Sequence, residues 1–247
     1  LETYLRPCKL GEDNGIIIPN MRNLFREHRG FWSKRRKTSL YLGILFLAVS
    51  LIVNFAAGRY SAKSATNFVG DMFLDNLPTI NFSYIIVEGA FLLIIVSVLL
   101  LILKPRYLLF SLKAVPIFNI ARSFFVSMTH LGIYPEQITL GDGPIDRLYI
   151  FFNLQDGFFF SAHTGLPLLM ALIVWHEKFW RYFFIGASAL FAIAVLFAHV
   201  HYSIDVFAAP FMTYGIFKIA STLFRKDYEL VHDKFEGIDN RMPPDKI

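Results

Sequence analysis

The sequence predicts an all-α integral membrane protein, built as a bundle of six transmembrane helices with both termini in the cytosol. Of its 247 residues, 55% are hydrophobic and only 17% are charged, whereas an ordinary soluble domain carries about 25% charged residues. A soluble domain of this length has too little interior to hide so much apolar surface. The 17% of aromatic residues also excludes a disordered chain, because disordered sequences are poor in aromatics.

Six apolar segments are long enough to cross a bilayer at about 1.5 Å per residue. They are residues 39–57, 80–103, 107–131, 158–175, 182–198 and 206–224. Residues 1–37 precede the spans as a polar extension, and residues 225–247 follow them as a charged tail. We expect both of these flanking regions in the cytosol.

The charge of the connections sets the expected orientation. Lys and Arg gather before the first span, in the turns 104–106 and 176–181 and after the last span. The connection 132–157 is acidic, and the connection 59–79 carries Asp71 and Asp75 beside Arg59 and Lys63. Cytoplasmic loops carry the excess of Lys and Arg, so these two connections and the 199–205 turn should lie on the outer or lumenal face. The N-terminal basic cluster is interpreted as a lipid-facing flank rather than a nucleic-acid site.

Ionisable side chains at membrane depth are costly and usually functional or internally paired. His163 lies about one turn into the fourth predicted span, and His201 and Asp205 lie at the turn between the fifth and sixth spans. The chain descends from His163 and returns toward His201, so both histidines should reach the outer face at similar depth. On a helix His201 and Asp205 would share a face, where the carboxylate could fix the imidazole tautomer.

Two histidines, a carboxylate and an arginine at this depth suit phosphoryl transfer. One histidine would attack phosphorus and become a phospho-histidine, while the other protonates the leaving oxygen. Asp205 would stabilise the developing imidazolium, and Arg122 would neutralise charge on the phosphoryl oxygens. We expect no metal ion or other cofactor; a His/His/Asp zinc site is the competing interpretation.

The other candidate substrate-binding residues each have a structural alternative. Arg122 and Glu88 lie at similar depth, roughly 12–14 Å below the outer ends of their spans at 1.5 Å per residue. They would pair with each other, or Arg122 would bind the substrate. Asp156 and Ser161 would either cap the fourth span or contact the substrate. His199 would either support the neighbouring histidine or simply lie at the membrane interface.

Two segments resemble the sphingomyelin synthase family, a branch of the type 2 phosphatidic acid phosphatase (PAP2) superfamily. They are Ser-Ala-His-Thr at 161–164 and His-Tyr-Ser-Ile-Asp-Val at 201–206. The resemblance covers roughly residues 75–224, and it is weaker around Arg122. It implies a six-span, PAP2-like catalytic domain over residues 38–224.

The resemblance also implies residue roles, with His201 as nucleophile, Asp205 as its partner and His163 as general acid and base. Three departures from the pattern bear on the reaction: Ala162 replaces the usual Gly, Asp156-Gly157 reverses the family's order, and Val195 stands where the superfamily phosphatases carry an Arg. A phosphomonoester carries close to two negative charges and is usually held by several cations. A site with Arg122 as its evident cation therefore suits a singly charged phosphodiester.

The expected function is transfer of a phosphocholine- or phosphoethanolamine-type head group from a glycerophospholipid to ceramide or diacylglycerol. Hydrolysis of a lipid phosphate is the alternative, because water can resolve the same phospho-histidine. A catalytically inactive multi-pass membrane protein is the second alternative. The expected partners are the donor and acceptor lipids and the bilayer, without nucleic acid, and the oligomeric state is left open.

Overall fold

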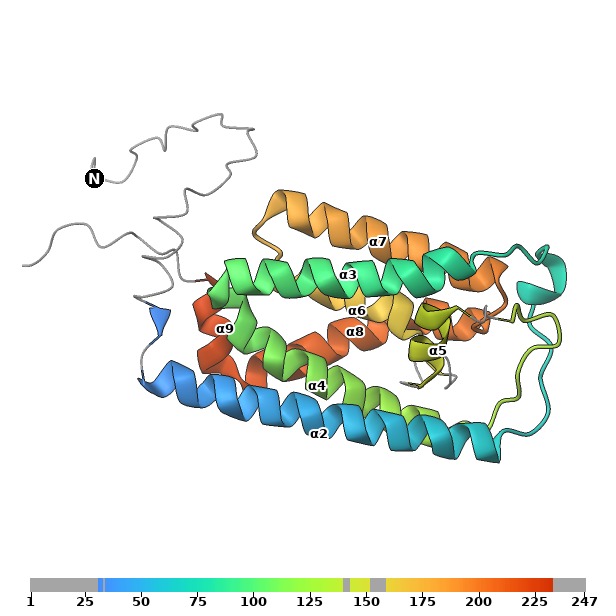
Figure 1. The fold of residues 1–247 in the computed structure, drawn as a ribbon, viewed down its shortest axis with the longest axis horizontal. Helices are drawn as coiled ribbons and strands as arrows, with labels where there is room; N and C mark the ends of the chain where they lie inside the picture. Colours follow the sequence, from blue (N-terminus) through green and yellow to red (C-terminus); the bar gives the residue numbers. More distant parts are fainter. Residues whose placement is uncertain (1–30, 33, 140–142, 152–158, 233–247) are drawn as a thin grey trace, which may run out of the picture.

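The computed structural model describes residues 31–32, 34–139, 143–151 and 159–232, and in this part of the chain all regular structure is helical (Figure 1). A single 3-10 turn, η1, lies between the first two long helices. The elements are α2 (Lys34–Ser64), η1 (Leu74–Asn76), α3 (Ser83–Leu103), α4 (Pro105–Met128), α5 (Pro144–Phe151), α6 (Ala162–Ile173), α7 (Lys178–Phe197), α8 (Ser203–Leu223) and α9 (Arg225–His232).

Five helices, α2, α3, α4, α7 and α8, are long and apolar enough to cross a membrane. They confirm the prediction of a multi-pass, all-helical membrane protein. The predicted fourth span, 158–175, contains the shorter α6 of 12 residues, because Phe159–Ser161 before it and Val174 after it are not helical. At 1.5 Å per residue α6 rises about 18 Å, less than the roughly 30 Å of a hydrocarbon core.

Helix α6 lies inside the bundle, packed against α4, α7 and α8. Gly165 allows the closest approach. A Cβ atom at this position would lie 2.7 Å from Cζ of Phe118 and 2.9 Å from Oγ1 of Thr213. Large apolar side chains on the outer helices are instead exposed, as at Ile52 of α2 and Phe211 of α8, which is the pattern of helices that face lipid.

One end of the bundle is fastened by ion pairs and hydrogen bonds between turns. Glu177 pairs with Lys104 at 2.7 Å and with Arg106, which joins the α6–α7 turn to the α3–α4 turn. The hydroxyl of Ser39 donates to Oδ2 of Asp227 at 2.9 Å, which joins the start of α2 to α9. Both ends of the described chain therefore lie at this end of the bundle (Figure 1).

The opposite end contains the starts of α6 and α8 and two connections, 65–82 and 129–139 (Figure 1). The connections are joined by the amide of Thr66, which donates to the carbonyl of His130, and the amide of Ile80 donates to the carbonyl of Phe197 at the end of α7. Helix α5 lies within the predicted connection 132–157, and α9 lies within the predicted tail 225–247. Each has only 8 residues, too few for a strong periodic signal.

Candidate functional site

His201 and Asp205 meet at the N-terminal cap of α8. Because α8 begins at Ser203, His201 precedes the helix, and the expected shared helical face is replaced by a cap arrangement. The amide of Tyr202 donates to Oδ2 of Asp205 at 3.2 Å, and the same oxygen lies 3.2 Å from Nδ1 of His201. The carboxylate thus caps the helix and orients the imidazole at the same time.

His163 lies in the first turn of α6 and faces His201, with 5.9 Å between the centroids of the two rings. The two helix starts are joined directly, because the amide of Ser161 donates to the backbone carbonyl of Asp205 at 2.9 Å. The structure therefore brings together the two histidine segments that the sequence analysis singled out.

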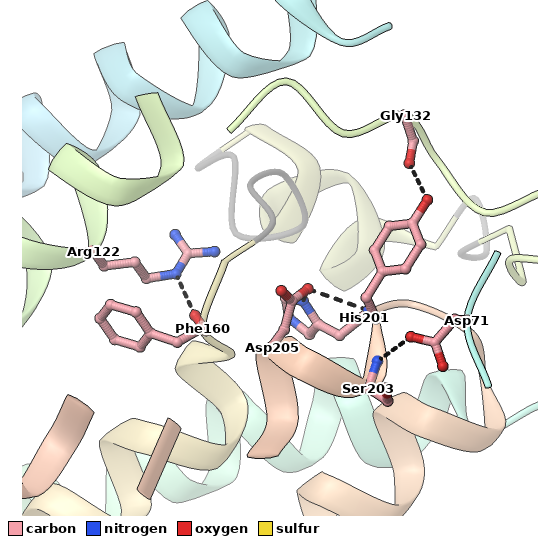
Figure 2. A network of polar contacts seen from close by, with 8 residues as sticks. Asp71, Arg122, Gly132, Phe160, His201, Ser203 and Asp205 are labelled. Atoms are coloured by element: carbon pink, nitrogen blue, oxygen red, sulfur yellow. Dashed lines mark hydrogen bonds and ion pairs between the residues drawn. The ribbon is translucent and has the colours of Figure 1, made fainter. Parts of the chain in front are cut away.

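Arg122 reaches this region from α4. Its Nε donates to the carbonyl of Phe160 at 3.3 Å, and its Nη1 donates to Oδ1 of Asn54 on α2 at 3.4 Å. Figure 2 shows Arg122 and Phe160 on one side of His201 and Asp205. Glu88 is half-buried on α3 and forms no ion pair with Arg122; both residues belong to the described chain. The pairing alternative for Arg122 is therefore not found.

The region is buried and rich in polar atoms without partners. His201, Asp205 and Ser161 are at most 2% exposed, and His163 is 9% exposed. Within the described residues, four buried side-chain atoms here have no hydrogen-bond partner: Oγ of Ser161, Nδ1 of His163, Oγ1 of Thr164 and Oδ1 of Asp205. Buried polar groups are nearly always paired, so this cluster has the character of a site for a polar ligand.

The remaining sequence candidates have different outcomes. Ser161 occupies the N-cap position of α6, yet its hydroxyl makes no capping hydrogen bond. His199 is fully buried, with φ of 54°. Its Nδ1 lies 3.4 Å from Oγ1 of Thr79 and 3.9 Å from a carboxylate oxygen of Glu136, so it contacts the connections 65–82 and 129–139. Asp156 lies outside the described residues.

Two residues that the sequence analysis did not assign to the site contact it. Tyr149 of α5 places its hydroxyl oxygen 2.6 Å from Nε2 of His163. Asp71 accepts a hydrogen bond at 2.7 Å from the amide of Ser203, the first residue of α8 (Figure 2). Neither carries a sequence signal, because both lie in connections whose path depends on the folded bundle.

The cap of α8 is held from outside by the two connections. Asp71 also accepts the amides of Phe73 and Leu74 through Oδ1. The hydroxyl of Tyr202 donates to the carbonyl of Gly132 at 2.8 Å. These contacts fix the backbone that directly follows His201.

Electrostatics at this end of the bundle favour the ionised form of Asp71. Burial raises the pKa of Asp71, but hydrogen bonds from the amides of Ser203, Leu74 and Phe73 lower it by a larger amount. The pKa of Asp71 therefore lies below 3.8. Nearby, the hydrogen bond to Asp75, together with partial burial, raises the pKa of Tyr134 to about 12. Tyr134 therefore stays protonated near neutral pH and donates to Asp75 at 2.7 Å.

The contribution of Asp71 to stability is expected to depend on pH. Its folded pKa is lowered, so its stabilisation is complete above the unfolded value of 3.8 and is lost as the pH falls through the folded pKa. The Asp71→Asn variant should be less stable than wild type at pH 7, by about 2 kcal/mol. Thermal unfolding in detergent between pH 7 and pH 3 should show this difference shrinking in acid. A difference that stays constant over that range would contradict the assignment.

Within the described residues, no three His, Cys, Asp or Glu side chains gather as a set of metal ligands. No match was found when the chain was compared with protein-family models, with curated proteins and with solved structures. The function must therefore be inferred from the chemistry of the site residues themselves.

Proposed function

We propose that this protein is a membrane-embedded phosphotransferase that moves a phosphodiester head group from a glycerophospholipid to a lipid alcohol. The observation that carries the proposal is the meeting of the His163 and His201 rings, 5.9 Å apart between centroids, with Asp205 on one of them. Reacting atoms need to approach to about 3–3.5 Å, so a phosphorus atom between the two rings would be within reach of both.

In the proposed first step, Nε2 of His201 attacks phosphorus while Asp205 stabilises the positive charge through Nδ1. The bond between phosphorus and the diacylglycerol oxygen breaks, and this oxygen takes a proton from His163. In the second step, His163 removes the proton from the acceptor hydroxyl, and that oxygen attacks phosphorus. The phosphorus–nitrogen bond to His201 then breaks, which restores both histidines.

The presence of one buried arginine near this site supports a phosphodiester substrate. Arg122 is buried, and it contacts the carbonyl of Phe160, which directly precedes the Ser161 segment. The other buried cation of the described chain, Lys113, donates to the carbonyl of Ser39 at 2.7 Å, at the opposite end of the bundle. One guanidinium matches the single negative charge of a phosphodiester better than the two charges of a phosphomonoester.

The proposal includes six crossings, cytosolic termini and a site on the outer or lumenal face. Helix α6 begins beside the cap of α8 and leads to Glu177, which pairs with Lys104 at the other end of the bundle. The segment that contains α6 thus connects the same two ends of the bundle as α3 and α7. Because other helices enclose this segment, the non-helical residues that flank α6 can lie at membrane depth. The turns rich in Lys and Arg lie at the end shared with the start of α2, which favours the cytosol for that end.

Lipid mass spectrometry can test the proposed function. The purified protein would be placed in vesicles of mixed glycerophospholipids, with and without ceramide. We expect a head-group ester of ceramide to form together with an equal amount of diacylglycerol, and only when ceramide is present. Release of diacylglycerol and free phospho-head group in both samples would support the hydrolase alternative. Unchanged lipids in every sample would support an inactive protein and overturn the proposal.

A further inference from the structure

His163 has a close contact with a residue that takes no part in the two proposed steps. The hydroxyl oxygen of Tyr149 lies 2.6 Å from Nε2 of His163, and the two rings are stacked with 6.0 Å between centroids and 29° between planes. The other ring nitrogen of His163, Nδ1, is buried without a hydrogen-bond partner among the described residues. The two nitrogens of His163 thus have different environments.

Tyr149 is held firmly in this position. Its side chain is 1% exposed and belongs to an apolar cluster between α3 and α7. The other buried members of that cluster are Ile86, Val87, Ala194, Val195, Ala198, Val200 and Val206. The Phe91 ring also packs on Tyr149, at 6.5 Å between centroids. A phenylalanine at position 149 would retain these apolar contacts and lose only the hydroxyl.

We propose that Tyr149 is a positioning residue that holds Nε2 of His163, so that Nδ1 is the atom that gives and takes the proton. This inference rests on the proposed function. The arrangement parallels that of His201, whose Nδ1 is held by Asp205. In both cases, a hydrogen bond to one ring nitrogen decides which nitrogen reacts.

With Tyr149 in this role, every proton that moves in the two proposed steps has a donor and an acceptor. The first step requires His163 as an imidazolium, whose Nε2–H donates to the Tyr149 oxygen. Nδ1 then gives its proton to the leaving diacylglycerol oxygen, and later takes one from the acceptor hydroxyl. Nε2 keeps its proton throughout, and the phenol accepts the same hydrogen bond in both states. Tyr149 itself is neither ionised nor modified.

The first test is spectroscopic and does not depend on activity. The full chain would be labelled with ¹⁵N-histidine in lipid nanodiscs, and the His163 signals assigned by their loss in His163→Gln. We expect the neutral ring of wild-type His163 to carry its proton on Nε2, and Tyr149→Phe to give a mixture of tautomers. A proton on Nδ1 in wild type, or an unchanged tautomer in the variant, would overturn the inference even in an inactive protein.

The second test is kinetic and uses two donors with the same head group. A lipid donor has a poor leaving group that needs a proton, whereas a p-nitrophenyl donor leaves without one. For Tyr149→Phe we expect the rate of the first step, measured as release of the leaving group in a single turnover, to fall about 10–100-fold with the lipid donor and less than about 3-fold with the nitrophenyl donor, with donor binding unchanged. An equal fall with both donors would show a merely structural role and overturn the inference.

Tyr107→Phe is the matched control, because it removes a hydroxyl from an equally buried tyrosine at the other end of the bundle. The Tyr107 hydroxyl donates to Oε1 of Glu177 at 3.2 Å. Tyr107 belongs to the first turn of α4, and α4 begins at the end of the bundle opposite to the starts of α6 and α8 (Figure 1). We expect this variant to treat both donors alike. A wild-type protein that cleaves neither donor but shows the Nε2–H tautomer would reject the proposed function while leaving the positioning by Tyr149 supported.

Discussion

Replacing His201 by alanine is expected to lower head-group transfer by about 10³-fold or more. If His201 forms the covalent bond to phosphorus, its loss removes the intermediate itself rather than one stabilising contact. The imidazole is 2% exposed and lies 3.2 Å from Asp205, so it is already oriented in the absence of substrate. His163→Ala should lose activity to a comparable extent with lipid donors, since the leaving oxygen then has no proton source.

The covalent intermediate gives a direct measurement. Wild-type protein incubated briefly with a phospholipid labelled at phosphorus should carry acid-labile label, and peptide mapping should locate it on His201. His201→Ala should carry none. Label on a different residue, or an active enzyme that never becomes labelled, would refute the assignment of His201 as nucleophile.

His130→Ala provides the matched control. His130 is exposed at the same end of the bundle, where its ring packs on Tyr60 at 5.7 Å between centroids. We expect this variant to retain activity within about 3-fold and to accept label as wild type does, since surface substitutions have small effects. Thermal unfolding of all three variants would separate loss of chemistry from loss of fold. An equal loss in His130→Ala would show that the assay reports stability.

Hydropathy was sufficient to predict the outer helices of the fold. Their apolar runs are long, and most of their side chains face outward, as in α3, where a window of 18 residues is only 17% buried. Hydropathy was insufficient to predict the length of α6, because the apolar run continues past this helix on both sides. Hydropathy does not distinguish a helix from buried non-helical backbone. The short helices α5 and α9 give too few turns for a periodic pattern.

The positions of the histidines along the chain were sufficient to predict that the starts of α6 and α8 lie at the same end of the bundle. His163 and His201 could be placed at one depth by counting along the chain, and the structure brings their rings together. Counting gave the same depth for Glu88 and Arg122, yet these do not pair, because equal depth does not fix which way a helix faces. Tyr149 and Asp71 reach the site from connections, and no local pattern predicts the path of a connection.

Replacing Asp205 by asparagine is expected to lower transfer by about 10²–10⁴-fold, and the upper value is the loss seen when the carboxylate that orients the histidine of a catalytic triad is replaced by an amide. The amide keeps the size of the carboxylate and can still accept the Tyr202 amide, which now lies 3.2 Å from Oδ2. It has no charge to stabilise the imidazolium that develops on His201. The loss should therefore appear in kcat and in the rate of phospho-histidine formation.

Asp71→Asn separates this catalytic effect from helix capping. Both carboxylates accept amides at the start of α8, Asp71 from Ser203 at 2.7 Å and Asp205 from Tyr202, but only Asp205 contacts an imidazole. We expect both variants to unfold several degrees below wild type at pH 7. Asp71→Asn should nevertheless retain transfer within about 5-fold. If both variants lost activity in proportion to stability, Asp205 would be a cap and nothing more, and the charge on His201 would need another source of stabilisation.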